Sequence, residues 1–137
     1  NGIVGAGVPH DWATHMIGHE LTALYNIDHA RTLAIVLPSL LQVQRESKRA
    51  KLLQYAERVW HIAPGSASED ERIDQAIART RAFFESVGIA TRLQDYGLGA
   101  EVVDAVVAQL SAHNMVALGE HRSTTPEVSR AILQGAL

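Results

Sequence analysis

Apolar side chains recur at intervals of three and four residues along most of the chain, which is the spacing of amphipathic α-helices. After a flexible, glycine-rich lead-in, this spacing predicts a first helix over residues 10–25, with Pro9 suited to its first turn. A second helix is predicted to begin at residue 29, capped by Asp28, and its nearly continuous apolar run implies a buried, central helix. Pro38 falls inside that run, so we expect a bend there unless a new helix begins.

The middle of the chain carries two further helical patterns separated by a Pro-Gly break at residues 63–66. The basic stretch 45–51 leads into a third amphipathic segment, and its charged face is interpreted as solvated. Ser68 and Glu71 have the spacing of a capping box, which predicts a fourth helix ending at Gly88 in the left-handed conformation. Four aromatic residues at core-facing positions are interpreted as packing residues: Trp12, Trp60, Phe83 and Phe84.

The last third of the chain predicts a connector over residues 93–98 and two more helices. Residues 99–112 are rich in valine, which would also suit a strand, but the helical neighbours favour a fifth helix. Thr125 and Pro126 have the order of an N-cap and a first-turn proline, so they predict a short final helix. The sequence therefore predicts an all-α fold in one domain, residues 1–137.

Composition narrows the possible functions. The 137 residues include no cysteine, which excludes disulfides and thiolate metal sites and is compatible with a cytoplasmic protein. A net charge of −3 and an isoelectric point near 6.2 provide no basic field for nucleic acid, and no apolar run is long enough to span a membrane. The chain opens on Asn1 within a glycine-rich stretch, so we expect it to be a piece of a longer protein.

Histidines provide the main chemical signal, because four of the seven lie in the first 29 residues: His10, His15, His19 and His29. His15 and His19 are four residues apart and so share one face of a helix. The spacing does not place His29 beside them, and Glu20 is turned about 100° away from His19. The Glu of a zincin motif is missing after His15, which excludes that class of metalloprotease. From the residues alone, ordinary hydrogen-bonded histidines are the commoner explanation.

Two segments closely resemble the second signature of the iron-containing, group III alcohol dehydrogenases. They are GAGVPHDWATHMIGHEL at residues 5–21 and YNIDHARTLAIVLP at residues 25–38. The pattern is a histidine, a second four residues later, a third ten residues after that, and then an apolar helix carrying Leu-Pro. The best match is the butanol dehydrogenase and NADPH-dependent aldehyde reductase branch, and the likeness continues through residues 48–60, 83–84 and 95–98.

The resemblance implies the helical C-terminal domain of the dehydroquinate synthase-like fold, without the N-terminal α/β nucleotide-binding domain. It makes His15 and His29 metal ligands on a hairpin over about residues 8–46, with outer helices over about residues 47–137. It gives His19 a catalytic role close to the nicotinamide of the cofactor. The metal would be Fe²⁺ or Zn²⁺, and NADP or NAD would be bound mainly by the other domain.

The same resemblance implies a homo-oligomer acting on small alcohols and aldehydes. The family's first two metal ligands come from an Asp-x-x-x-His helix earlier in the chain, and no such pair precedes His15, so we expect the chain alone to be inactive. One alternative is a non-enzymatic helical interaction module with structural histidines. The other is a different metalloenzyme in which His10 also ligates the metal.

Overall fold

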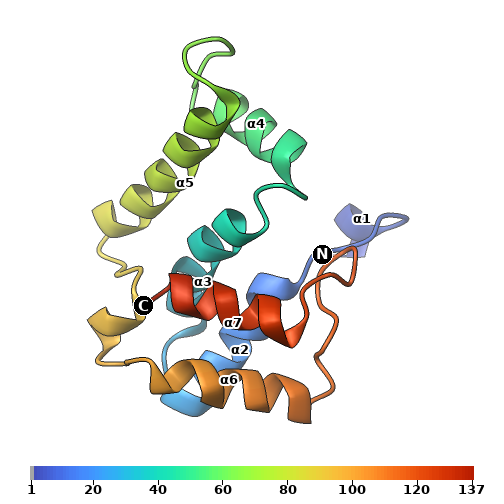
Figure 1. The fold of residues 1–137 in the computed structure, drawn as a ribbon, viewed down its shortest axis with the longest axis vertical. Coiled ribbons are helices and arrows are strands. Elements are labelled where there is room, and N and C mark those ends of the chain that lie inside the picture. The colour runs from blue at the N-terminus through green and yellow to red at the C-terminus, as the bar shows by residue number, and fades with distance from the viewer. Residues whose placement is uncertain (1) are drawn as a thin grey trace.

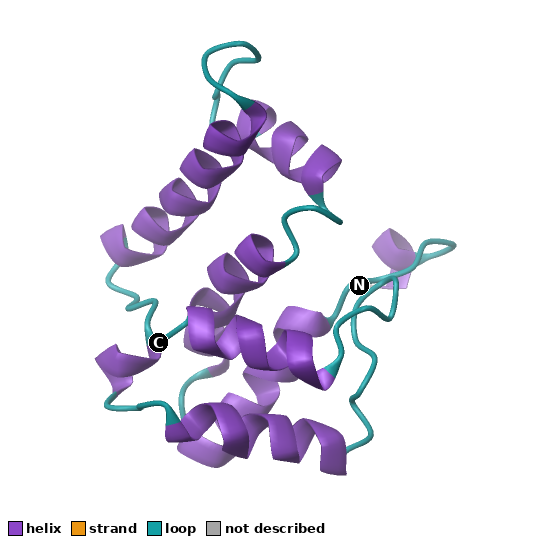
Figure 2. Ribbon diagram, in the orientation of Figure 1, coloured by secondary structure: helices purple, strands orange, loops and turns teal. Residues whose placement is uncertain are grey.

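The computed structural model describes residues 2–137, and within them the chain forms helices and connections but no strand (Figures 1 and 2). The elements are α1 (Gly2–Gly5), α2 (Ala13–Tyr25), α3 (His29–Val43), α4 (Arg49–Arg58), α5 (Glu69–Ser86), the 3₁₀ helix η1 (Leu93–Tyr96), α6 (Glu101–Ala112) and α7 (Pro126–Gly135). The predicted all-α class is confirmed, although α1 replaces part of the expected flexible lead-in. No helix in the described part has the length and apolarity needed to cross a membrane.

Local sequence signals set several helix ends as predicted. The Ser68 hydroxyl accepts a bond from the Glu71 backbone N–H, and the Glu71 carboxylate accepts from the Ser68 N–H, which completes the capping box of α5. Thr125 caps α7 ahead of Pro126. Gly88 follows α5 with φ of 80°, a value that favours glycine.

Helix α3 lies at the centre of the molecule and contacts α2, α5 and α7. Ile35, Val36 and Leu40 are buried, which confirms the predicted central position. Pro38 lies inside α3 and does not begin a new helix. Asp28 occupies the N-cap position without a side-chain cap bond, and instead pairs with Arg31 at 3.4 Å.

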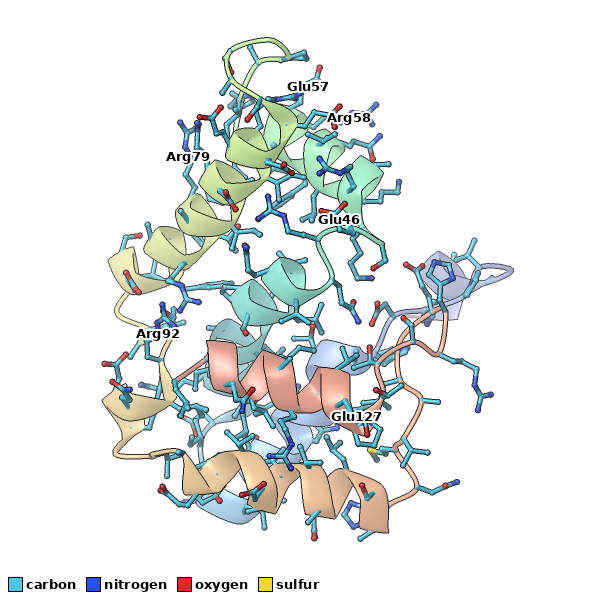
Figure 3. The ribbon with its side chains drawn as sticks, viewed as in Figure 1. Glu46, Glu57, Arg58, Arg79, Arg92 and Glu127 are labelled. Carbon is cyan, nitrogen blue, oxygen red and sulfur yellow. The ribbon has the colours of Figure 1, made fainter. Side chains whose placement is uncertain are left out.

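Two apolar clusters meet on α3. The larger joins α2, α3, α6 and α7, and the smaller joins Leu52 of α4 to Ile73 and Ile77 of α5. Leu41 packs against both clusters. Polar groups tie the same two layers at the surface, where Arg45 pairs with Asp74 at 2.9 Å; the neighbouring Glu46 is labelled in Figure 3. Such exposed pairs contribute about 1 kcal/mol at most, so the apolar contacts dominate.

The prediction that all four aromatic residues pack in the core is wrong for two of them. Phe83 is 53% exposed and Trp12 is 38% exposed, whereas Trp60 and Phe84 are partly buried. Helical spacing identifies the face on which a side chain lies, but a neighbouring element must also cover that face to bury it. Trp12 instead contacts histidine rings, as described below.

Candidate functional site

Three histidine rings from two helices meet in one place, here called the histidine cluster: His15, His19 and His29. His15 and His19 are one turn apart on α2, with ring centres 6.2 Å apart. His29 is the first residue of α3, and its ring centre lies 5.3 Å from His15 and 4.6 Å from His19. The structure therefore brings together the three histidines that the resemblance selects.

A glycine permits the contact between the two helices that forms the cluster. Asn26 ends α2 in the left-handed conformation with φ of 55°, and the chain turns into α3 within three residues. The middle of α2 then faces the first turn of α3, where a Cβ on Gly18 would lie only 2.9 Å from the Thr32 hydroxyl oxygen. Thr32 is fully buried, and its hydroxyl donates to the His29 carbonyl at 2.8 Å. Gly18 and Thr32 thus set the position of His29.

The chemistry of His29 suits a nitrogen ligand. Its Nδ1 is buried and has no hydrogen-bond partner among the described residues. Burial lowers the pKa of His29, and the nearby His19 and His15 rings lower it further. A depressed pKa keeps the imidazole neutral near pH 7, and the neutral form is the one that binds a divalent ion.

Ring spacing is also compatible with shared coordination. A metal–nitrogen bond of about 2.1 Å and a tetrahedral angle put two ligating ring centres roughly 5 Å apart. The 5.3 Å between His15 and His29 matches this spacing, and so does the 4.6 Å between His19 and His29. Distance alone does not separate ligand from neighbour, so the choice of His15 and His29 rests on the resemblance.

No carboxylate joins the histidine cluster. Within residues 2–137, no group of three His, Asp or Glu side chains is arranged to hold a metal ion. Glu20 is buried and its Oε1 lies 2.7 Å from Nδ1 of His113, at the end of α6. This contact gives His113 a structural role, and it keeps Glu20 out of the cluster as expected. His61 and His121 are exposed.

A second group of rings borders the cluster on the N-terminal side of α2. Trp12 meets the His15 ring edge-on at 4.8 Å, and its Nε1 donates to Nδ1 of His10 at 3.2 Å. His10 is thus engaged by Trp12. Asp11 accepts from Lys48 at 2.6 Å. Burial alone would raise the pKa of Asp11, but the bonds from Lys48 and from the Ala13 N–H lower it below its usual value.

Comparison with known proteins identifies the chain. The profile of the Fe-containing alcohol dehydrogenase family, C-terminal part, matches residues 4–137. The chain belongs to the iron-containing alcohol dehydrogenase family. It is 59% identical over 136 residues to the NADPH-dependent aldehyde reductase YqhD of Escherichia coli, covering 99% of this chain and 35% of that protein. It is 31% identical to a probable NADH-dependent butanol dehydrogenase of Bacillus subtilis, over 100% of this chain and 35% of the relative.

The fold agrees with this membership. The structure of substrate- and cofactor-free E. coli YqhD superposes with a TM-score of 0.93 at 58% identity, over 98% of this chain and 35% of that one. The present chain therefore spans about a third of the length of these iron-containing alcohol dehydrogenases, and it corresponds to their helical C-terminal part. Family membership was predicted correctly from the histidine signature, and the all-α class from the helical spacing of apolar residues.

Two site features were not predicted from the sequence. Gly18 lies inside a strong helical pattern, and a glycine in such a place often marks a close approach of two backbones, so a signal was present. Trp12 occupies an apolar position of the helical pattern, and nothing in its spacing distinguishes a core residue from one that flanks a site.

Proposed function

We propose that this chain is the metal-binding, helical part of an NAD(P)H-dependent reductase that interconverts aldehydes and primary alcohols. The histidine cluster carries the proposal, because the His15 and His29 rings lie at a spacing that suits two ligands of one divalent ion, with the His19 ring beside them. The relatives support the reaction class: one is an NADPH-dependent aldehyde reductase and another a probable NADH-dependent butanol dehydrogenase. The greater identity to the former favours NADPH.

His15 and His29 are the residues of this chain that would hold the ion, Fe²⁺ or Zn²⁺. The buried, unpartnered Nδ1 of His29 and its lowered pKa fit this role. The two remaining ligands would come from the Asp-x-x-x-His helix that the resemblance places earlier in the chain of the whole protein. When bound, the ion supplies Lewis-acid polarisation of the carbonyl oxygen, and the reduced nicotinamide supplies the hydride.

His19 would act on the proton that accompanies hydride transfer. Its ring is exposed on the same face of α2 as His15 and lies 4.6 Å from the His29 ring, centre to centre. Imidazole donates and accepts protons near neutral pH, so His19 can pass a proton between solvent and the product oxygen. We propose His19 as a catalytic and nicotinamide-facing residue, and not as a ligand.

This proposal has consequences for the chain by itself. With two of four ligands and no phosphate-binding glycine loop, the isolated chain is expected to bind metal weakly and to have no reductase activity. The whole protein is expected to be a cytoplasmic homo-oligomer. Removal of the other domain would expose the surface that lines the cleft between the two domains, so the isolated chain is expected to self-associate.

The decisive test is made on the full-length protein. Metal content and NADPH-dependent butyraldehyde reduction are measured for the wild type, His15→Ala and His29→Ala. Each variant is expected to lose the metal and to lose turnover by at least about a hundredfold, because removal of a ligand removes the polarising ion. His121→Ala, which removes an exposed histidine outside the cluster, is the matched control. Unchanged metal content and turnover in the cluster variants would show that these histidines are structural.

A further inference from the structure

A hollow of about 370 Å³ lies beside the histidine cluster. It is lined by Val8, Pro9, His10, Asp11, Trp12 and His15. Its volume is in the range of small-molecule sites. One lining residue, His15, belongs to the cluster, whereas Val8, Pro9 and the Trp12 indole supply apolar surface. The hollow therefore places apolar surface next to one proposed metal ligand, His15, with the polar side chains of His10 and Asp11 also in its lining.

Trp12 is held in a defined position even though 38% of it is exposed. Its Nε1 donates to His10 Nδ1 at 3.2 Å, and its ring meets His15 edge-on with centres 4.8 Å apart. A neutral His10 that accepts at Nδ1 carries its proton on Nε2. A Cβ on Gly5 would lie 1.6 Å from that Nε2, so glycine at this position lets the N-terminal segment close against the His10 ring.

The backbone on either side of Trp12 is also fixed. Asp11 Oδ1 accepts from the Ala13 N–H at 2.9 Å, and Asp11 Oδ2 accepts from Lys48 Nζ at 2.6 Å. Ala13 is fully buried at the start of α2. An exposed aromatic ring with both flanks anchored offers a rigid surface at little cost in conformational entropy.

We propose that the Trp12 indole is the wall against which the hydrocarbon chain of the aldehyde packs, which makes Trp12 a specificity-determining residue. The inference rests on the proposed function and specifies where the hydrocarbon chain of the substrate lies. An aldehyde has a polar carbonyl and an apolar tail, and the hollow offers the proposed ligand His15 beside the apolar ring of Trp12. The carbonyl would face the histidine cluster, and carbons further along the chain would contact the indole.

The test compares aldehydes of increasing length in the full-length enzyme. For Trp12→Ala, kcat/KM for hexanal is expected to fall about tenfold, because the variant loses the contact of about two methylene groups. For acetaldehyde, which has only one carbon beyond its carbonyl, the change is expected to stay within about twofold, with metal content unchanged. Trp60→Ala removes the other tryptophan of this chain, which packs against Tyr55. It is expected to change kcat/KM by the same factor for every aldehyde.

An equal loss of kcat/KM for aldehydes of every length in Trp12→Ala would overturn the inference. A rise in the KM for NADPH alone would also overturn it, because it would mean that the indole contacts the nicotinamide. An enzyme that reduces no aldehyde would overturn the proposed function as well, so the two failures are distinguishable.

Fluorescence provides a readout that does not depend on activity. Co²⁺ added to full-length protein should quench part of the tryptophan emission, and this quenched part should be much smaller in Trp12→Phe than in the wild type, because the indole touches the proposed ligand His15. Trp60→Phe should leave the quenched part nearly unchanged. Equal quenching in the two variants would contradict the placement of Trp12 beside the metal.

Discussion

Replacing Gly18 by alanine tests how the histidine cluster is assembled. Gly18 is buried in the middle of α2, and the added methyl group would lie 2.9 Å from Thr32 Oγ1, 3.4 Å from Leu33 Cδ2 and 3.5 Å from Thr32 Cβ. Thr32 is fully buried, and its hydroxyl donates to the His29 carbonyl, so it cannot turn away without losing that bond. Either Thr32 gives up that bond, or the first turn of α3, which carries His29, moves.

Three terms decide the net effect on stability. Alanine in place of a helical glycine stabilises by about 1 kcal/mol. Overpacking a dense contact costs about 2 kcal/mol, and loss of the buried hydroxyl bond costs about 1 kcal/mol more. Gly18→Ala is therefore expected to lower the free energy of unfolding by about 2 kcal/mol. Displacement of His29 should weaken metal binding about tenfold, in line with changes that misorient a ligand.

A double-mutant cycle isolates the clash. Urea unfolding and Co²⁺ titration are measured on full-length protein carrying Gly18→Ala, Thr32→Ala or both. Thr32→Ala removes the oxygen that the new methyl group would meet. The double variant should therefore lose much less stability than the sum of the losses in the two single variants. Gly135→Ala is the matched control, because its Cβ would lie 2.5 Å from Ser39 Oγ in a contact away from the cluster. It should reduce stability and leave metal affinity unchanged.

The reasoning would be refuted if Gly18→Ala raised stability by about 1 kcal/mol, the helix-propensity gain alone, and left metal affinity unchanged. That result would mean that α2 and α3 have room at this contact and that glycine there is incidental. Additive effects of Gly18→Ala and Thr32→Ala would likewise exclude Thr32 as the group that resists the methyl.

Two further predictions concern helix ends. His113→Ala leaves the buried Glu20 carboxylate without its partner and should lower stability by about 1–3 kcal/mol in urea unfolding; an unchanged midpoint would show that the pair contributes nothing. Glu71 has a pKa held below its ordinary value of 4.5 by hydrogen bonds from the Ser68 side chain and backbone, so its stabilising effect is present above pH 4.5 and lost as pH falls through the lower, folded-state pKa. Glu71→Gln should flatten that part of the stability–pH curve, and a parallel curve would contradict the prediction.

Helix identities and ends were predicted well because their signals are local. The capping box of Ser68 and Glu71, the Thr125-Pro126 start and the left-handed Gly88 each depend on a few neighbouring residues. The central position of α3 followed from an apolar run that left no face for solvent. These features require no knowledge of how helices cross.

The arrangement of the histidines was beyond local reasoning. Spacing put His15 and His19 on one face, but the position of His29 depends on where α3 meets α2, which the Gly18–Thr32 contact decides. The exposure of Trp12 and Phe83 was missed for a related reason, because covering elements come from distant parts of the sequence. The resemblance supplied the assignment of His15, His19 and His29, since it carries information about an entire fold that spacing lacks.

The position of the Leu41 side chain has a consequence for how the molecule unfolds. Because this one residue packs on both the larger and the smaller cluster, the α4–α5 hairpin cannot detach without exposing part of the larger core. The two layers are therefore expected to melt in one cooperative transition, with amide protons of α4 and α5 exchanging through the same global opening as those of α2 and α3.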